Sequence, residues 1–259
     1  MSLQLWRGGI RTKMKNIRLT LEYDGSRYSG WQRLGKGEED NTIENKLLEL
    51  IKKMTGEKVE LNCGSRTEAG VHAYTQVANF KTGTDMKMYE IKNYFNRYLP
   101  MDIAVLEVEE VPERFHASLN AKTKTYLYRI AIGDSPSVFE RKYTYYCFDR
   151  PNIEKMKIAS KTLIGKHDFR DFSSVKKSKS TLKEIYEVDI YQDEKEIQIT
   201  IKANDFLHNM ARMMVSTLLE IGLDKRPMDI IEEILDPKSI ETGSVPAHAQ
   251  GLFLQHIEY

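Results

Sequence analysis

The chain has 259 residues, enough for one large domain or two domains of ordinary size with a substantial buried core. It is 41% hydrophobic and 30% charged, a composition that is typical of a globular protein and excludes a disordered one. Its net charge of +1 means that any nucleic-acid partner must be held by local basic patches and not by the overall field.

The cysteines and the apolar runs further limit the class of protein to which this chain can belong. The chain has two cysteines, Cys63 and Cys147, which lie far apart in the sequence and lack metal-ligand spacing. This pattern suits a reducing cytosol and argues against a disulfide framework or a zinc site. No apolar run approaches the roughly 18 residues that span a bilayer. We interpret residues 1–13 as a leader or remnant, because they lack a signal-peptide core and Met14 directly precedes the first periodic segment.

Hydrophobic patterns of period two and period 3.6 alternate along the first half of the chain. They predict a strand at 17–23, followed by a helix that begins at a cap on Asn41 or Thr42 and stops at Gly56. The other elements predicted for this half are two short strands, a helix and a closing strand, at 59–62, 73–80, 85–99 and 103–108. The helix is expected to bury Met88, Ile91, Phe95 and Tyr98.

The second half repeats this order of elements. The patterns predict a strand at 125–132, a helix capped by Asn152 at 152–163, and the two strands of a hairpin at 184–191 and 196–202. They then predict two further helices at 205–221 and 228–235 and a last strand at 252–257. Each half therefore reads β-α-β-β-α-β, the ferredoxin-like order. We expect an α+β fold in which two such units, 14–117 and 118–259, form one broad mixed, mainly antiparallel sheet with helices on one face and a cleft on the other.

One connection differs between the two halves. The hairpin turn is minimal in the second half, but the equivalent connection in the first half is enlarged into a loop at 64–72, and enlargement of a loop on a rigid scaffold suggests added function. The loop carries Arg66 and Glu68 between two glycines. A carboxylate there can act as nucleophile or general base. The alternative is a surface turn in which Glu68 pairs with Arg66 and contributes less than ~1 kcal/mol.

Other candidate residues lie in the second half. Arg212 is placed mid-helix among methionines, where a buried guanidinium would need a carboxylate partner unless it reaches solvent from the helix edge. Tyr126, on a predicted strand, could stack on a nucleobase or belong to the core. Lys176, Lys177 and Lys179 lie in a polar loop that could contact phosphates or be a solvated charge run.

Seven ordered motifs give the sequence a resemblance to a known family. They are LEYDGSRYSGWQR at 21–33, RTEAGVHA at 66–73, FHA at 115–117, KTYLYR at 124–129, GKHDF at 165–169, FLHNMAR at 206–212 and GLFL at 251–254. Across residues 17–259 the chain resembles the TruA family of tRNA pseudouridine synthases. Each motif alone would be weak, whereas their number and order make the resemblance specific.

The resemblance implies an isomerase that detaches uracil from its ribose, turns it and rejoins it through carbon, without a metal or an organic cofactor. The implied substrates are uridines in the anticodon arm of tRNA (tRNA positions 38 to 40), bound in the cleft by a cytoplasmic homodimer. The resemblance places Glu68 at the catalytic nucleophile position, Arg66 as the residue that helps to extrude the nucleotide, Tyr126 against the flipped base and Arg212 as the partner of the acid.

The sequence departs from the family at two positions. Glu68 stands where an aspartate is expected, and its extra methylene displaces the carboxylate by roughly 1.5 Å. A misplacement near 1 Å can already lower the rate of a reaction by ~10²-fold. Ser118 stands where the family commonly has arginine. The leading interpretation is an active pseudouridine synthase that uses Glu68. The alternatives are a catalytically silent relative that binds or remodels structured RNA and a different carboxylate-dependent reaction on nucleosides, such as base excision.

Overall fold

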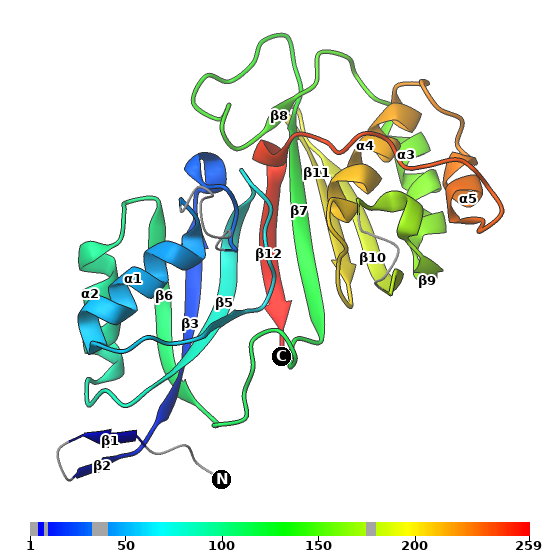
Figure 1. Ribbon diagram of the computed structural model, residues 1–259. Coiled ribbons are helices and arrows are strands. Elements are labelled where there is room, and N and C mark those ends of the chain that lie inside the picture. The colour runs from blue at the N-terminus through cyan, green and yellow to red at the C-terminus, as the bar shows by residue number, and fades with distance from the viewer. Residues whose placement is uncertain (1–4, 8–9, 33–40, 175–179) are drawn as a thin grey trace. The chain divides into compact units, whose positions relative to one another are not determined.

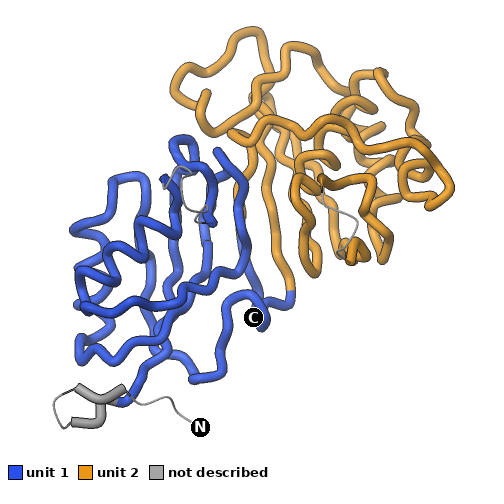
Figure 2. The backbone as a smooth tube through the Cα atoms, in the orientation of Figure 1, with its two compact units in different colours: residues 1–122, 256–259 blue, residues 123–255 orange. Residues whose placement is uncertain are grey.

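The computed structural model describes residues 5–7, 10–32, 41–174 and 180–259 (Figure 1). Within these residues the fold is α+β, with five α-helices and ten strands assigned to one large mixed sheet. The chain divides into two compact units (Figure 2): unit 1 comprises residues 1–122 and 256–259, and unit 2 comprises residues 123–255. No helix in the described part of the chain is both long and apolar enough to cross a membrane.

Unit 1 follows the predicted order of elements closely. Its main elements are β3 (Lys15–Tyr23), α1 (Ile43–Thr55), β4 (Leu61–Cys63), β5 (His72–Thr82), α2 (Met88–Tyr98) and β6 (Ile103–Val111). The strand β3 pairs antiparallel with both β6 and β5, and β4 pairs antiparallel with β5. In a separate two-stranded sheet, β1 (Leu5–Arg7) pairs antiparallel with β2 (Ile10–Thr12), within the segment interpreted as a leader.

Local sequence signals account for the ends of α1. The Thr42 side chain accepts a hydrogen bond from the Asn45 backbone N–H at 3.3 Å, as an N-cap residue does. The helix ends at Gly56, whose φ of 73° lies in the left-handed region that favours glycine. These two residues confirm Thr42, of the two predicted caps, and the predicted stop.

The second helix of unit 1 differs from the prediction. It begins at Met88 and buries Ile91 and Phe95, but Tyr98 is 54% exposed, so the prediction that Tyr98 is buried is wrong. The Tyr98 ring lies 4.7 Å from that of Tyr94 on the same helix, and the buried position at this end of the helix belongs to Leu99. A ring-to-ring contact along the helix surface therefore replaces the expected core contact.

Unit 2 has additional short elements. In chain order it contains β7 (Thr123–Ala131), β8 (Tyr145–Tyr146), α3 (Ile153–Ser160), β9 (Gly165–Asp168), β10 (Leu182–Gln192), β11 (Glu196–Ala203), α4 (Met210–Gly222), α5 (Ile230–Leu235) and most of β12 (Leu252–Glu258). Its strands run in the order β7-β11-β10-β9 with antiparallel pairing. The short strand β8 pairs parallel with β7, which makes the sheet mixed.

Alternation along β7 and β11 defines the core face of unit 2. Tyr126, Tyr128 and Ile130 lie opposite Ile201, Ile199 and Ile197, and all six are at most 6% exposed. The residues between them, such as Arg129, therefore point to the other face of the sheet. The helix α3 packs against both β10 and α4 (Figure 1).

The start of the long helix in unit 2 departs from the prediction. The helix α4 begins at Met210 and not at 205, because Asn209 has a φ of 64° and interrupts the right-handed helical path. The division between the two compact units falls after Lys122. Residues 256–259 belong to unit 1, where the Lys122 N–H donates to the Glu258 carbonyl at 2.8 Å and the Tyr259 hydroxyl donates to the Ala117 carbonyl at 2.9 Å.

Candidate active site

The loop at residues 64–71 leaves β4 and enters β5 with alternating exposure. Ser65 and Thr67 are 7% and 5% exposed, whereas Arg66 is exposed and Glu68 is half-buried. Ser65 and Thr67 thus point inward, and Arg66 between them is exposed to solvent. This alternation explains how a short loop can be anchored to the core and still present Arg66 and Glu68 outward.

A buried polar network holds the inward side of the loop. Gln76 on β5 is fully buried, and its amide oxygen accepts from the Ser65 N–H at 3.2 Å and from the Val77 N–H at 3.1 Å. Its amide nitrogen donates to the Ser65 carbonyl at 2.6 Å and to the Tyr23 hydroxyl at 3.3 Å. The Tyr23 hydroxyl also hydrogen-bonds the Thr67 hydroxyl at 2.7 Å. Each polar group of Gln76 is used, which is what a buried amide requires.

The state of Tyr23 suits this role. Burial raises the pKa of the Tyr23 phenol well above its ordinary value, and the hydrogen bonds with Thr67 and Gln76 only partly oppose that change. The phenol therefore remains protonated at neutral pH. It can accept from the Gln76 amide and donate to Thr67 at the same time.

The far side of the loop is held by residues 28–31. The Trp31 N–H donates to the Thr67 carbonyl at 3.0 Å, and the Gly70 N–H donates to the Tyr28 carbonyl at 3.3 Å. Gly30 has a φ of 97°, and a Cβ on it would lie 2.8 Å from the Thr67 carbonyl oxygen. Only glycine permits this approach. Residues 28–31 thus support the loop that carries Glu68.

The start of the loop packs against the last strand. A Cβ on Gly64 would lie 2.5 Å from Ile257 Cδ1 and 2.8 Å from the Tyr259 hydroxyl oxygen. The Tyr259 hydroxyl donates to the Ala117 carbonyl, and the Tyr259 ring lies 5.2 Å from that of Phe115. The FHA motif at 115–117 and the end of the chain therefore meet at the base of the loop.

In unit 2, Tyr126 lies on the core face of β7 and is 6% exposed. Its ring meets the Phe206 ring edge-on, with centroids 4.9 Å apart. The neighbouring Asp205 receives hydrogen bonds from the ammonium groups of Lys124 at 2.6 Å and Lys183 at 2.9 Å. Strands β7 and β10 thus hold the segment that packs against Tyr126.

The charges around Asp205 decide its protonation. Burial by itself would raise the pKa of the Asp205 carboxyl, but Lys124 and Lys183 outweigh burial and lower it below its ordinary value. Asp205 is therefore ionised at neutral pH. The cluster of two ammonium groups and one carboxylate retains a net positive charge.

Arg212 is oriented by acceptors in its own unit. Its Nε donates to the Ala247 carbonyl at 2.5 Å, and its Nη1 donates to the Asn209 side-chain oxygen at 3.2 Å. The Asn209 amide nitrogen in turn donates to the Ser174 hydroxyl at 2.9 Å. The left-handed backbone of Asn209 places this side chain within reach of the guanidinium one turn further along.

The structure therefore brings Arg66 and Glu68 together on one loop, and it places Tyr126 and Arg212 in unit 2. Lys176, Lys177 and Lys179 lie outside the described residues. The supporting roles of Tyr23, Gln76 and Asn209 were not predicted from the sequence. A signal existed for Gln76, which is a polar residue at an inward position of an apolar strand, opposite Leu21.

Comparison with known proteins places this chain in a family. A family model described as tRNA pseudouridine synthase matches residues 20–119 and 159–259. The chain belongs to the tRNA pseudouridine synthase family, and its similar relatives carry the name tRNA pseudouridine synthase A, which confirms the resemblance to the TruA family.

The curated relatives match along their full length. The chain is 43% identical to tRNA pseudouridine synthase A 2 of Bacillus cereus over 247 residues, which is 95% of this chain and 100% of that relative. It is 40% identical to tRNA pseudouridine synthase A 2 of Clostridium perfringens over 250 residues, with the same coverage. Identity to tRNA pseudouridine synthase A 1 of Clostridium tetani is 42% over 249 residues, again with 95% and 100% coverage.

Proposed function

We propose that this protein converts uridine to pseudouridine in the anticodon arm of tRNA, with Glu68 as the catalytic carboxylate. The names of the full-length relatives support tRNA as the substrate. The observation that carries the proposal is the anchored loop at 64–71. Gln76, Tyr23 and the 28–31 segment hold its buried side, so that Arg66 and Glu68 emerge from a base of defined geometry.

In the proposed reaction the bond between N1 of uracil and C1′ of ribose breaks, and a bond between C5 and C1′ forms. C5 loses a proton and N1 gains one, so that the product is an isomer and no oxidant or reductant is consumed. Glu68 acts as the nucleophile or base in this exchange. Arg66, exposed two residues before it, helps to draw the nucleotide out of its stack.

We assign roles to two residues of unit 2, Tyr126 and Arg212, because they lie in the motifs at 124–129 and 206–212 that resemble the family. Tyr126 stacks on the flipped base, and Arg212 forms the ion pair with the catalytic carboxylate. The two hydrogen bonds from Arg212 to Ala247 and Asn209 support this role, because they fix the direction of the guanidinium before any substrate binds.

Glutamate at position 68 can act as the catalytic carboxylate if its longer side chain reaches the reactive position from a backbone that does not move. Gly30 contacts the loop backbone closely, and Gly64 contacts Ile257 and Tyr259, so neither end of the loop has room to shift inward. Adjustment is then left to the side-chain torsions of Glu68. For this reason we expect Glu68→Asp to retract the carboxylate by roughly one bond length and to slow the reaction.

The test is pseudouridine formation in unmodified tRNA and rRNA transcripts, read by carbodiimide mapping. We expect product in tRNA with the wild type, none with Glu68→Ala, and RNA binding that is the same for both proteins. Glu60→Ala, which removes an exposed carboxylate just before β4, is the matched control and should keep full activity. If wild type and Glu68→Ala both bind RNA and neither yields product, the protein is a silent relative. Higher activity in Glu68→Asp would mean that glutamate impairs the site.

The wider organisation of the protein is also proposed from these features. The order of elements in unit 1 and the pairing of β3 with β6 and β5, and of β5 with β4, support a ferredoxin-like unit. We propose two such units, an RNA-binding cleft and a homodimer that acts in the cytoplasm. Sedimentation of the free protein, and of the protein with tRNA, tests the dimer.

A further inference from the structure

The connection between β7 and β8 places apolar side chains in solvent. Phe139 is 88% exposed and Val138 is 65% exposed, at the turn formed by residues 137–144. An aromatic side chain buries ~150–250 Å² when it is covered. Phe139 therefore contributes little to the core of unit 2, and its ring is available to a partner.

This turn is internally organised. The Glu140 carbonyl accepts from the Tyr143 N–H at 2.8 Å, the Thr144 N–H at 3.1 Å and the Thr144 hydroxyl at 3.1 Å. The Ser137 hydroxyl accepts from the Glu140 N–H at 3.4 Å. The Arg141 guanidinium reaches back to the Val138 carbonyl at 2.5 Å. These bonds hold the backbone on both sides of Phe139.

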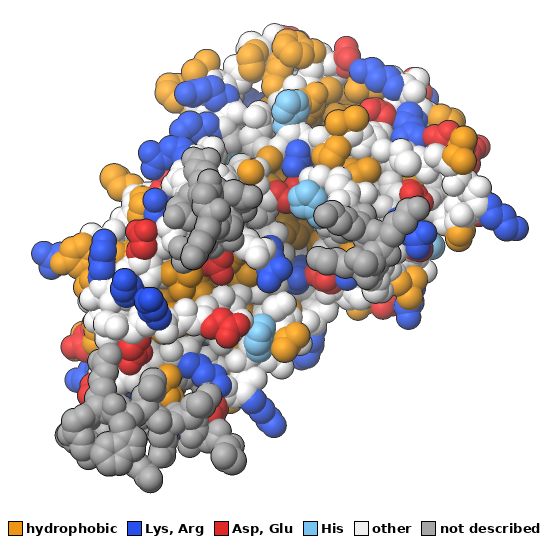
Figure 3. All heavy atoms as spheres, viewed as in Figure 1, with side chains coloured by type: hydrophobic (Ala, Val, Ile, Leu, Met, Phe, Trp, Pro, Cys, Tyr) orange, Lys and Arg blue, Asp and Glu red, His pale blue; other side chains and the backbone are white. Residues whose placement is uncertain are grey.

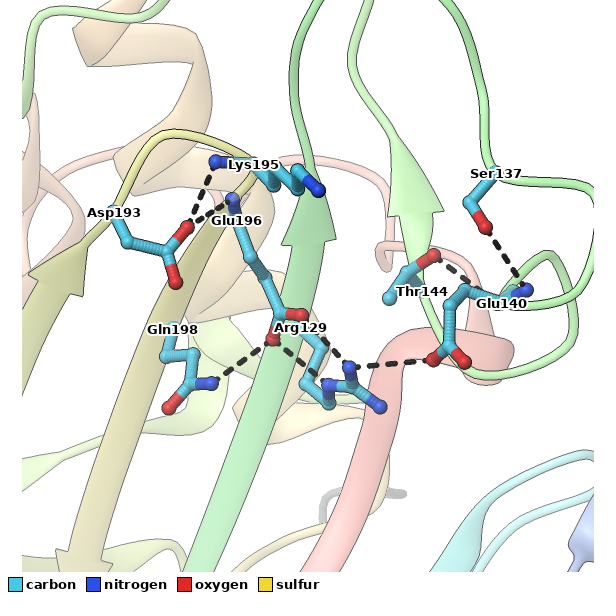
Figure 4. Close-up of polar contacts among 8 residues, drawn as sticks. All are labelled: Arg129, Ser137, Glu140, Thr144, Asp193, Lys195, Glu196 and Gln198. Atoms are coloured by element: carbon cyan, nitrogen blue, oxygen red, sulfur yellow. Dashed lines mark hydrogen bonds and ion pairs between the residues drawn. The ribbon is translucent and has the colours of Figure 1, made fainter.

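The turn is also attached to the sheet (Figure 4). Arg129 on β7 forms two parallel hydrogen bonds with Glu196 on β11, of 2.8 and 2.7 Å, and its Nη2 also lies 3.4 Å from the Glu140 carboxylate. The Gln250 side chain donates to the Thr144 carbonyl at 3.0 Å, which secures the other end of the turn. The exposed ring is therefore held on a rigid support, which lowers the entropic cost of binding.

The charge at the turn favours one kind of partner. Arg141 and Lys142 are exposed directly after Phe139 and Glu140, and the Glu140 carboxylate faces Arg129. The tip thus combines an exposed ring with two exposed cationic side chains. At the top of Figure 3, hydrophobic side chains lie beside lysine and arginine side chains over the loops around β8.

We propose that the turn at residues 137–144 is a second RNA-contact site, in which Phe139 stacks on an unpaired base while Arg141 and Lys142 contact the adjacent phosphates. Single-stranded RNA is bound by this combination of stacking rings and cations. The proposal rests on the proposed function only in that RNA is the ligand. It assigns no part of the isomerisation to the turn.

The experiment measures binding of a fluorescently labelled, unmodified tRNA transcript to full-length protein by anisotropy. We expect Phe139→Ala to raise the Kd by about five- to 150-fold, the range expected when one base–aromatic stack is lost. Phe139→Trp should bind like the wild type, and Phe139→Leu should be as weak as the alanine variant, because leucine keeps apolar area but has no ring. Arg141→Ala with Lys142→Ala should reduce the dependence of the Kd on salt.

The matched control is Tyr89→Ala, which removes a 59% exposed ring beside Lys87 on α2 in unit 1 and should leave the Kd unchanged. The proposal is overturned if Phe139→Ala binds within twofold of wild type, if Phe139→Leu binds like wild type, or if Tyr89→Ala weakens binding equally. It is also overturned if Phe139→Ala changes only the sedimentation of the free protein, which would make the turn a contact between two copies. Pseudouridine formation by wild type is scored in parallel, so a failure of the proposed activity is seen separately from a failure of this contact.

Discussion

Replacing Tyr23 by phenylalanine tests whether the buried network positions the candidate catalytic loop. The substitution keeps the ring and removes only the hydroxyl that joins Thr67 at 2.7 Å to Gln76 at 3.3 Å. Thr67 and Gln76 are 5% and 0% exposed, so water cannot replace the lost partner. The Gln76 amide nitrogen keeps its bond to the Ser65 carbonyl at 2.6 Å, which limits the damage to the Thr67 side.

The magnitude follows from these contacts. Loss of a partner by a buried polar group costs about 1–3 kcal/mol. With one group retaining a second partner, we expect Tyr23→Phe to lower the free energy of unfolding by about 2 kcal/mol. A shift of the loop by a fraction of an ångström should slow the chemical step by about tenfold, since ~1 Å can cost ~10²-fold. The Kd for RNA should change little, because the Tyr23 hydroxyl that is removed bonds Thr67 and Gln76 inside unit 1.

The assay pairs urea unfolding with single-turnover pseudouridine formation at saturating tRNA. Thr82→Val is the matched control, because it removes another buried hydroxyl, bound to Glu57 at 2.6 Å, at the opposite end of β5. It should lower stability by a similar amount and leave the rate unchanged. If Tyr23→Phe loses stability but keeps the wild-type rate, the network stabilises the loop without positioning it. An equal loss of rate in Thr82→Val would also refute the reasoning.

Two further substitutions test the close approach of Gly30 to the loop and the charge cluster around Asp205. Gly30→Ala should lower the free energy of unfolding by about 2 kcal/mol or more and reduce the rate of pseudouridine formation, because its Cβ would meet the Thr67 carbonyl. The control is Gly133→Ala, where φ is 122° and no atom lies within 4 Å of the new Cβ, so that only backbone strain is added. Urea unfolding of both variants separates the two effects, and equal losses would contradict the clash. Asp205→Asn should destabilise the protein at neutral pH, because the folded-state pKa of Asp205 is lowered. The difference from wild type should persist above the unfolded pKa of about 3.9 and disappear as the pH falls through the folded value; a difference that grew on acidification would contradict it.

The sequence predicted those elements whose signals are local. Alternating residues defined the buried side of β3, and Thr42 and Gly56 defined the two ends of α1. Each of these signals acts over a few residues, through strand alternation or a single cap. The order of motifs also predicted the family, since it depends on the sequence alone.

Elements that depend on distant partners were not predictable in the same way. The hydrogen bonds from Gln76 to Ser65 and Tyr23 join residues 11 and 53 positions apart, and nothing in the pattern of β5 names those partners. Asn209 interrupts the helical path although its neighbours have helical periodicity. The predicted burial of Tyr98 failed because helical periodicity gives the face of a residue but not the extent of the core beneath it.

The candidate site also has features that the sequence predicted and features that only the fold determines. The sequence by itself placed Arg66 and Glu68 in an enlarged loop, because residue type and spacing suffice to indicate a cation and a carboxylate between glycines. Only the tertiary structure decided which residues of the loop face inward and what holds them. That information resides in contacts between β3, β5 and the 28–31 segment, and chain folding alone brings these together.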